Sequence, residues 1–230
     1  IEEHLKRNAT WFERRLIQKQ YKKMALADAI ITLFPCSFKN INNIFPDKTY
    51  YFGHIVNALE PYEDLVADKF ITKNILFIGR PAYSKGAQTL IDAVLHHNNM
   101  VENDNLWHLD FIGMERKDIS NPCPKYCHCW GYLNKSIPEQ KEKYYTLLKY
   151  ASVLVNTTAV WNGASSLMEA LYYGTPIIVS KNPEILEMIG ENRVFCKYCQ
   201  EQDMASLLKQ LEILLMSPKN EYWEIAHNAN

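Results

Sequence analysis

The sequence lacks a large net charge of either sign, a long hydrophobic run and any internal repeat. Its formal net charge of -1 gives no basic field, so we expect no nucleic-acid partner. No apolar run approaches the roughly 18 residues that span a bilayer, and the charged residues 1–20 contain no signal-peptide core. We therefore expect a cytoplasmic protein. The first residue is Ile rather than Met, which suggests a fragment or a processed chain.

The composition is that of an ordinary folded domain. Hydrophobic residues make up 47% of the 230 residues and charged residues 22%, which provides ample material for a core. This length fits one large α/β domain, or one domain with part of another.

The six cysteines include two clusters, CPKYCHC and CKYC. Together the clusters suggest one zinc site with four ligands, Cys127, Cys129, Cys196 and Cys199. The spacing in the first cluster is wrong for a zinc knuckle, and reduced cysteines in a cytosolic core are the simpler interpretation. We expect neither a metal site nor disulfides.

Before residue 70 the pattern predicts one helix and two strands. Residues 2–26 predict a helix with an apolar stripe at Leu5, Ala9, Phe12 and Leu16. The segment ADAIITLF predicts a strand over 29–34 that ends at Pro35. KTYYFGHIVNALEP predicts a second strand that runs into a turn at Pro61.

From Asn74 onward, strands and helices alternate. Strands are predicted over 75–78, 108–112, 127–130, 152–156, 176–179 and 193–196. Helices are predicted over 86–96, 139–150, 165–173, 183–189 and 202–215. This alternation predicts an α/β fold with a Rossmann-like, doubly wound parallel sheet, in which ligands bind beyond the carboxyl ends of the strands.

Two cations follow the first of these strands, in ILFIGRPAYSKG. Gly79 allows a sharp turn, Arg80 can present a bidentate fork to phosphate oxygens, and Lys85 adds a point charge where a helix begins. The helix dipole disfavours a cation there, and an anionic ligand would remove that penalty. Two ordinary surface cations are the alternative interpretation.

A second polar loop follows the strand SVLVN. A helix begins near Ala164 or Ser165, and its free backbone N–H groups form an anion site. Glu169 lies on the first turns of this helix, and a carboxylate can accept hydrogen bonds from both hydroxyls of a ribose. The simpler role for Glu169 is that of a helix-dipole partner.

Several of these segments, in this order, resemble one family. ILFIGRPAYSKGAQTLIDAV, DFIG, CHCWGYLN, YASVLVNTT and SLMEALYYGTPIIVS are similar to the donor-binding half of a GT-B glycosyltransferase. They are most similar to the retaining enzymes of glycosyltransferase family 4. Residues 1–70 then correspond to a remnant of the acceptor-binding domain, 71–215 to the nucleotide-sugar-binding domain, and 216–230 to a crossover helix.

The resemblance implies a role for each candidate residue. Arg80, Lys85 and Gly79 bind the donor diphosphate, and Glu169 holds the ribose. The base lies against Gly131, Tyr132 and Leu133. A loop contacts the phosphates and sugar through Asn162, Gly163, Ala164, Ser165 and Ser166. Such a site needs no divalent metal.

Two departures from the family pattern concern catalysis. The first glutamate of the family's E-x7-E motif is replaced by Trp161, so either Asn162 takes over its polar contact or the sugar stacks on Trp161. The family's catalytic histidine has no counterpart, and His4 and His54 are candidates in name alone. On its apolar strand, His54 fits a hydrogen-bonded core residue better.

The leading hypothesis is a glycosyltransferase fragment. It binds a UDP- or GDP-sugar and transfers the sugar with retention to a hydroxyl of a glycan or lipid-linked acceptor. The alternative is a catalytically degenerate module that binds nucleotide-sugar and scaffolds other enzymes. A dinucleotide-dependent oxidoreductase is disfavoured, because GRPAYSKG lacks the G-x-G-x-x-G pattern.

The basic side chains of the first predicted helix allow two interpretations. The simpler interpretation is a solvated helix face. The alternative is part of a patch that contacts the inner face of a membrane. These side chains are Lys6, Arg7, Arg14, Arg15, Lys19, Lys22 and Lys23.

Overall fold

The computed structural model describes residues 10–54, 56, 63–102, 105–119, 125–158 and 164–229. The chain divides into two units. The first comprises Ile1–Ile55 with Pro183–Met188, and the second Val56–Asn182 with Ile189–Asn230. The boundary predicted at residue 70 falls inside a helix, α4 (Val66–Thr72), and residues 216–229 belong to the second unit.

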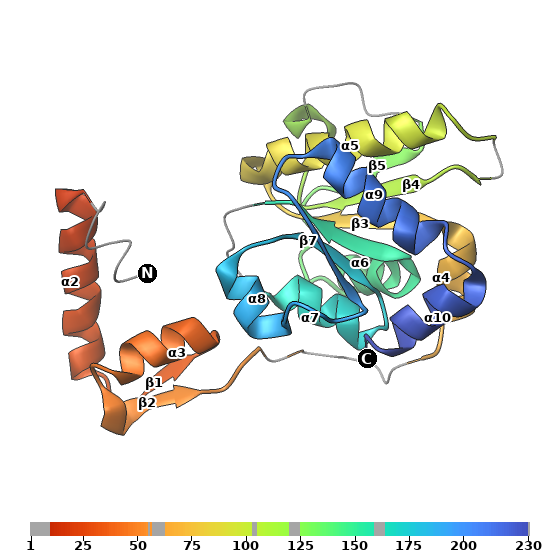
Figure 1. Ribbon diagram of the computed structural model, residues 1–230. Helices are drawn as coiled ribbons and strands as arrows, with labels where there is room; N and C mark the ends of the chain where they lie inside the picture. Colours follow the sequence, from red (N-terminus) through yellow and green to blue (C-terminus); the bar gives the residue numbers. More distant parts are fainter. Residues whose placement is uncertain are drawn as a thin grey trace. The chain divides into compact units, whose positions relative to one another are not determined.

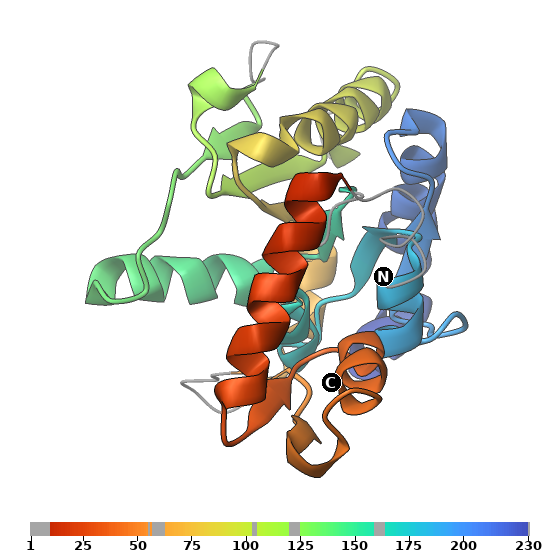
Figure 2. The same ribbon diagram turned by 90° about the vertical axis from the view of Figure 1, so that its left-hand side faces the viewer.

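In the first unit, α2 (Trp11–Leu26) is one continuous helix (Figure 2). Leu5, Ala9 and the Phe12 side chain of its predicted apolar stripe lie outside the described residues, and the remaining member, Leu16, is 50% exposed. The half-buried positions are instead Ile17, Tyr21 and Met24, spaced i, i+4 and i+7. The ammonium of Lys48 ends the helix by donating to the carbonyls of Ala25 and Ala27, at 2.7 and 2.8 Å.

The predicted strands of the first unit are shorter than expected. They are β1 (Ile30–Thr32) and β2 (Thr49–Tyr51), which pair in parallel. Between them lie a helix, α3 (Pro35–Asn42), and a 3-10 turn, η1 (Pro46–Lys48), where no helix was predicted. The first strand ends at Thr32, before the Pro35 predicted to close it, and Pro35 instead occupies the first helical position of α3, where proline is well tolerated. The predicted turn at Pro61 lies outside the described residues.

The second unit contains a six-stranded parallel sheet in the order β5-β4-β3-β6-β7-β8 (Figure 1). Its strands are β3 (Asn74–Ile78), β4 (His108–Ile112), β5 (Cys127–Cys129), β6 (Val153–Asn156), β7 (Ile177–Ser180) and β8 (Cys196–Cys199). Each strand was predicted within two residues except β8, which lies three residues further on. Turns occupy residues 191–195 instead, and the amide of Cys196 donates to the carbonyl of Arg193.

Helices cover both faces of this sheet, as expected for a doubly wound fold (Figure 1). On one face are α5 (Ser84–Asn98) and α9 (Met204–Leu215), and on the other α6 (Pro138–Tyr150) and α7 (Ser165–Tyr172). Two further helices are α10 (Lys219–His227) and α8 (Pro183–Ile189), of which Pro183–Met188 belong to the first unit. Among the described residues, every helix is too short or too polar to span a bilayer.

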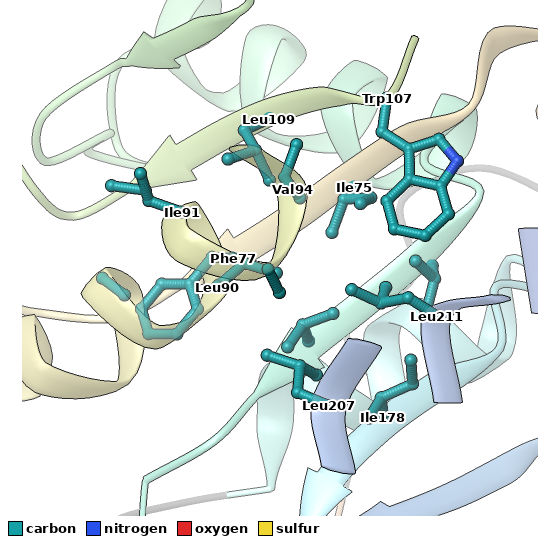
Figure 3. Close-up of a cluster of buried hydrophobic side chains, with 14 of the residues drawn as sticks. Ile75, Phe77, Leu90, Ile91, Val94, Trp107, Leu109, Ile178, Leu207 and Leu211 are labelled. Carbon is teal, nitrogen blue, oxygen red and sulfur yellow. The ribbon is translucent and has the colours of Figure 1, made fainter. Parts of the chain in front are cut away.

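The largest described core cluster lies between the sheet and the α5–α9 layer (Figure 3). Alternate residues of β3, Ile75 and Phe77, contact this cluster, while Leu76 is also fully buried and points to the opposite face. Burial on both faces explains why β3 is a continuous apolar run in the sequence. The cluster fixes the strands and therefore the loops that leave their carboxyl ends.

The predicted tail helix packs inside the second unit. Tyr222 and Ala226 of α10 form a small core with Val66 of α4. The ring centroids of Tyr222 and Phe70 are 5.5 Å apart. The Tyr222 hydroxyl donates to the carbonyl of Ser152 at 2.7 Å, just before β6. The tail thereby anchors α4 at the amino-terminal edge of the sheet.

Glycines follow three neighbouring strands at the opposite, carboxyl edge. The amide of Gly79 donates to Ile112 at 3.0 Å, and that of Gly113 to the carbonyl of Gly131 at 2.6 Å. Gly113 has a positive φ of 84°, and a Cβ atom there would lie 1.9 Å from the carbonyl oxygen of Gly79. The ends of β3, β4 and β5 are therefore held together by backbone that tolerates no side chain at Gly113.

Lys69 is a fully buried lysine of α4. Its ammonium donates to the Tyr173 carbonyl and to the Thr175 hydroxyl, both at 2.6 Å, and so ties α4 to the segment before β7. Burial lowers the pKa of Lys69 from 10.5 to about 7.

We predict that Gly113→Ala lowers the free energy of unfolding by about 3 kcal/mol or more, because backbone strain adds to a backbone clash. Gly131→Ala is the matched control, since its φ is also positive but its nearest neighbour, Glu115, is 3.7 Å away. Gly131→Ala should lower the free energy of unfolding by about 1–2 kcal/mol. Urea unfolding checks both, and equal losses would contradict the close approach at Gly113.

A second prediction concerns pH. Below about pH 7, Lys69 is protonated in the folded and the unfolded state, and burial of its charge lowers the free energy of unfolding. Between about pH 7 and 10.5 the unfolded chain binds more protons, so this cost falls as the pH rises. From about pH 7 to 9 the wild type should gain about 1–2 kcal/mol relative to Lys69→Met. Lys209→Met, an exposed lysine of α9, serves as the control in urea unfolding; the same pH trend in Lys69→Met as in wild type would contradict the assignment.

Candidate functional site

A cavity of about 250 Å³ opens at the carboxyl edge of the sheet, where the strand order reverses between β3 and β6. Four segments line it: the loop after β3, the first turn of α5, the loop after β6 and the loop before α9. In open α/β sheets, this reversal point is where ligands bind. The lining residues are Arg80, Ala82, Tyr83, Lys85, Gly86, Thr157, Thr158, Glu201 and Gln202.

The structure brings the two predicted cations, Arg80 and Lys85, to this one cavity. Both are exposed, and neither forms an ion pair within the described part of the chain. The Arg80 guanidinium lies 5.1 Å from the ring centroid of Tyr83, and the Tyr83 amide donates to the Arg80 carbonyl at 2.7 Å. A 3-10 turn, η2 (Pro81–Tyr83), therefore sets the separation of the two cations along the rim.

The floor of the cavity is a close contact between α5 and the loop after β6. The Thr157 hydroxyl donates to the Gly86 carbonyl at 3.1 Å, and a Cβ atom at Gly86 would lie 2.7 Å from that hydroxyl oxygen. Thr158 is held by Asn156, whose side-chain oxygen accepts from its hydroxyl at 2.7 Å. Sequence analysis missed both threonines, although two consecutive hydroxyls directly after the buried strand SVLVN were a visible signal.

The charge around the cavity is mainly positive. Within the described part of the chain no side chain caps the N-terminus of α5, so the positive end of the helix dipole adds to Arg80 and Lys85. Glu201 brings one opposing carboxylate, and Gln202 donates to it at 3.0 Å. This arrangement favours an anion with several oxygens, such as a diphosphate.

Glu169 does not line this cavity. It lies one turn into α7, almost fully buried, and its carboxylate is surrounded by donors. The Lys135 ammonium donates to Oε1 at 2.7 Å and to Oε2 at 3.0 Å. The Tyr144 hydroxyl donates to Oε2 at 2.6 Å, and the Tyr145 hydroxyl is 3.5 Å from Oε1. No local pattern in the sequence indicated that these three side chains contact Glu169.

Burial raises the pKa of both tyrosines, and the Glu169 charge adds to the effect. The pKa of Tyr145 rises to about 12, and that of Tyr144 lies further above its ordinary value. Both phenols are therefore protonated donors at neutral pH, which keeps the Glu169 carboxylate hydrogen-bonded inside the protein.

The other predicted site residues lie on two loops. Gly131, Tyr132 and Leu133 follow β5 at the same edge of the sheet, and Tyr132 is 81% exposed. Ala164, Ser165 and Ser166 begin α7, where Ala164 is buried and Ser165 is exposed. Trp161, Asn162 and Gly163 lie outside the described residues. The ligand contacts assigned to these loops stay predictions.

The four cysteines considered for zinc cannot share one ion. Cys127 and Cys129 lie on β5 and Cys196 and Cys199 on β8, at opposite edges of the sheet and about 24 Å apart by strand spacing. Among the described residues no cluster of potential metal ligands is present.

The expectation that the chain has no disulfide was wrong. Cys127 is disulfide-bonded. Cys129, Cys196 and Cys199 are free thiols, and burial raises the pKa of Cys196 and Cys199 to about 11, so these two are inert core groups.

His54, one of the two histidines named from the sequence, has no catalytic setting among the described residues. His54 packs edge-on against Phe34, with ring centroids 4.7 Å apart, and burial lowers its pKa. Its Nε2 atom has no hydrogen-bond partner among the described residues, so the expected hydrogen bond at this atom is not found. His4 lies outside the described residues.

Residues 72–215 match the family model described as glycosyl transferases group 1. This match spans the sheet from just before β3 to the end of α9. Comparison with curated protein sequences gave no match.

Solved structures with the same fold include WaaG, TarM and HepE. WaaG, a glycosyltransferase involved in lipopolysaccharide biosynthesis, has a TM-score of 0.66 at 12% identity, covering 99% of this chain and 66% of its own. TarM of S. aureus, in complex with fondaparinux, alpha-GlcNAc-glycerol and UDP, has a TM-score of 0.61 at 15% identity. The match covers 88% of this chain and 39% of TarM. HepE of Anabaena, in complex with UDP and glucose, has a TM-score of 0.62 at 14% identity. The match covers 88% of this chain and 57% of HepE. The chain thus spans between 39% and 66% of these proteins.

We predict that Tyr144→Phe lowers the free energy of unfolding by about 1–3 kcal/mol, because a buried carboxylate loses a short hydrogen bond. Tyr150→Phe, an exposed hydroxyl on the same helix, is the control and should change stability by less than about 0.5 kcal/mol. Thermal and urea unfolding measure both. Equal stability of the two variants would show that the Tyr144–Glu169 contact contributes nothing.

Proposed function

We propose a nucleotide-sugar site for this chain, which belongs to the group 1 glycosyl transferases. The cavity between β3 and β6 holds the diphosphate of the donor. The Arg80 guanidinium donates bidentate hydrogen bonds to the phosphate oxygens, and Lys85 and the N-terminus of α5 add positive charge. The observation that carries the proposal is the placement of both cations at one cavity, at the reversal point of the sheet.

The donor in this proposal is a UDP-sugar in preference to a GDP-sugar. TarM and HepE, which share the fold, were each solved in complex with UDP. Glu169 takes the ribose and the loop Gly131–Leu133 lies against the base, as the family resemblance implies. Both segments leave the sheet at the edge that carries the cavity, which is what a single extended ligand requires.

The proposed reaction is transfer of the sugar, with retention, to a hydroxyl of a glycan or lipid-linked acceptor. When the bond between sugar and diphosphate breaks, negative charge grows on the leaving phosphate. Arg80, Lys85 and the helix end stabilise that charge more strongly in the transition state than in the ground state. These groups supply the positive charge that a divalent ion would otherwise provide, so the proposal does not require a metal.

Binding and transfer need not reside in the same stretch of chain. This chain spans 39–66% of the three related structures, so the activity of a whole protein is a proposal that goes beyond it. We expect the chain by itself to bind the donor nucleotide and to transfer little sugar. The reaction is placed in the cytoplasm, at the inner membrane face where the acceptor is lipid-linked.

A second candidate function is a binding module without catalysis. Trp161 stands where the family has the first glutamate of its motif, and that glutamate contacts the donor near the sugar. Joining this chain to a complete acceptor domain distinguishes the two functions: sugar transfer supports the enzyme, and tight UDP binding without turnover supports the module.

Isothermal titration calorimetry with UDP and GDP tests the proposed site. Arg80→Ala and Lys85→Ala should each weaken UDP binding by about tenfold or more, because each removes a charge-assisted contact to phosphate. Glu201→Gln should strengthen it slightly, because it removes the opposing carboxylate.

The control is Lys219→Ala, an exposed lysine at the start of α10, which changes the net charge by the same amount as the cavity variants. Its affinity for UDP should match the wild type. Equal affinity across Arg80→Ala, Lys85→Ala and this control would refute the role of the two cations.

A further inference from the structure

Lys135 covers the carboxylate that the proposed donor needs. Its ammonium donates to both oxygens of Glu169 and lies 3.9 Å from the ring centroid of Tyr144 and 5.3 Å from that of Tyr145. The Glu169 side chain is 6% exposed, whereas that of Lys135 is 40% exposed. The lysine therefore lies between the carboxylate and solvent.

The other partners of Glu169 leave no open approach within the described residues. Tyr144 and Tyr145 are 5% and 6% exposed, so their hydroxyls reach the carboxylate from inside the protein. Lys135 is the only one of the three donors with substantial contact to solvent. A pair of ligand hydroxyls that approaches Glu169 from solvent must take the place of this ammonium.

The backbone around Lys135 is fixed, so its side chain is the part that can move. The Asn134 side-chain oxygen accepts from the Ser136 amide at 2.9 Å, and the Asn134 carbonyl accepts from the Ile137 amide at 3.0 Å. The Asn134 amide in turn donates to the Gln140 side chain on α6 at 2.7 Å. These bonds form a tight turn, and the flexible four-carbon stem of Lys135 starts from it.

We propose that Lys135 is a positioning residue. In the free protein its ammonium blocks the Glu169 carboxylate, and the ammonium is displaced when a ribose binds. This inference rests on the proposed function, in which Glu169 accepts the ribose hydroxyls. The ammonium keeps the carboxylate oriented and paired until two hydroxyls replace it. Inorganic pyrophosphate carries no hydroxyls of this kind and leaves the Lys135–Glu169 pair intact, so the lysine lowers the affinity for ribose-bearing ligands and has no such effect on pyrophosphate.

The test compares UDP with inorganic pyrophosphate by calorimetry. Lys135→Met keeps the stem and removes the ammonium, so UDP no longer competes with an ion pair and should bind about two- to fivefold more tightly. Pyrophosphate should not bind Lys135→Met more tightly than the wild type. Loss of a cation by itself weakens the binding of any anion, so tighter UDP binding is specific to removal of the competitor.

Two further variants sharpen the test. Lys135→Arg keeps the charge and presents a two-pronged donor to the carboxylate, so it should bind UDP no more tightly than the wild type. Lys219→Met removes an exposed lysine elsewhere and should leave both affinities unchanged. Circular dichroism melts confirm that each variant is folded, and Lys135→Gln replaces the Met variant if the latter does not fold.

A measurement on the wild type needs no variant. Lysine acetylation followed by mass spectrometry should modify Lys135 faster when UDP is saturating, because the ammonium has left Glu169. Unchanged labelling, together with unchanged or weaker UDP binding in Lys135→Met, overturns the inference and leaves the proposed function intact. If the wild type binds neither UDP nor pyrophosphate, the proposed function fails and this inference fails with it.

Discussion

The reversal of strand order between β3 and β6 is the constraint on which the candidate site depends. Right-handed crossovers send the chain to opposite faces of the sheet on the two sides of this point, so the loops after β3 and β6 diverge and leave an opening. Arg80, Lys85 and Thr157 meet there although they are far apart in the sequence. The core between the sheet and the α5–α9 layer keeps that opening in place.

The glycines at this edge are a second consequence of the same packing. Gly113 approaches the Gly79 backbone so closely that no side chain fits, and Gly86 presses against the Thr157 hydroxyl. Close backbone contact removes flexibility from the strand ends, and this rigidity lets two exposed cations keep a defined separation. A site that stabilises charge on a leaving group depends on such preorganisation.

Glu169 shows how a buried charge shapes its surroundings. An ionised carboxylate removed from water must be paired and hydrogen-bonded, and here Lys135 and Tyr144 satisfy it. The carboxylate is thereby oriented but occupied, so ligand access and internal pairing compete for the same two oxygens. Its local position on a helix gives no hint of that competition.

Much of the second unit could be predicted from sequence, because buried parallel strands and amphipathic helices leave periodic patterns. The strand β4 and the helix α8 were predicted with their observed bounds, whereas β8 was misplaced by three residues and α3 and α4 were missed. Short elements carry too few periodic positions to be distinguished from loops. Leu16 of α2 was predicted on a buried stripe and is half exposed, because packing decides which of two adjacent faces is buried.

By itself, the sequence determined the α/β class, the order of the βα units and the cations after β3, since these follow from local patterns and from family motifs. Only the tertiary structure decided that Thr157 and Glu201 share a cavity with those cations, that Lys135 occupies Glu169, and that the two cysteine clusters lie on opposite edges of the sheet. Each of these is a contact, or a separation, between distant segments. Such relations are set by strand order and helix packing, which no short window of residues encodes.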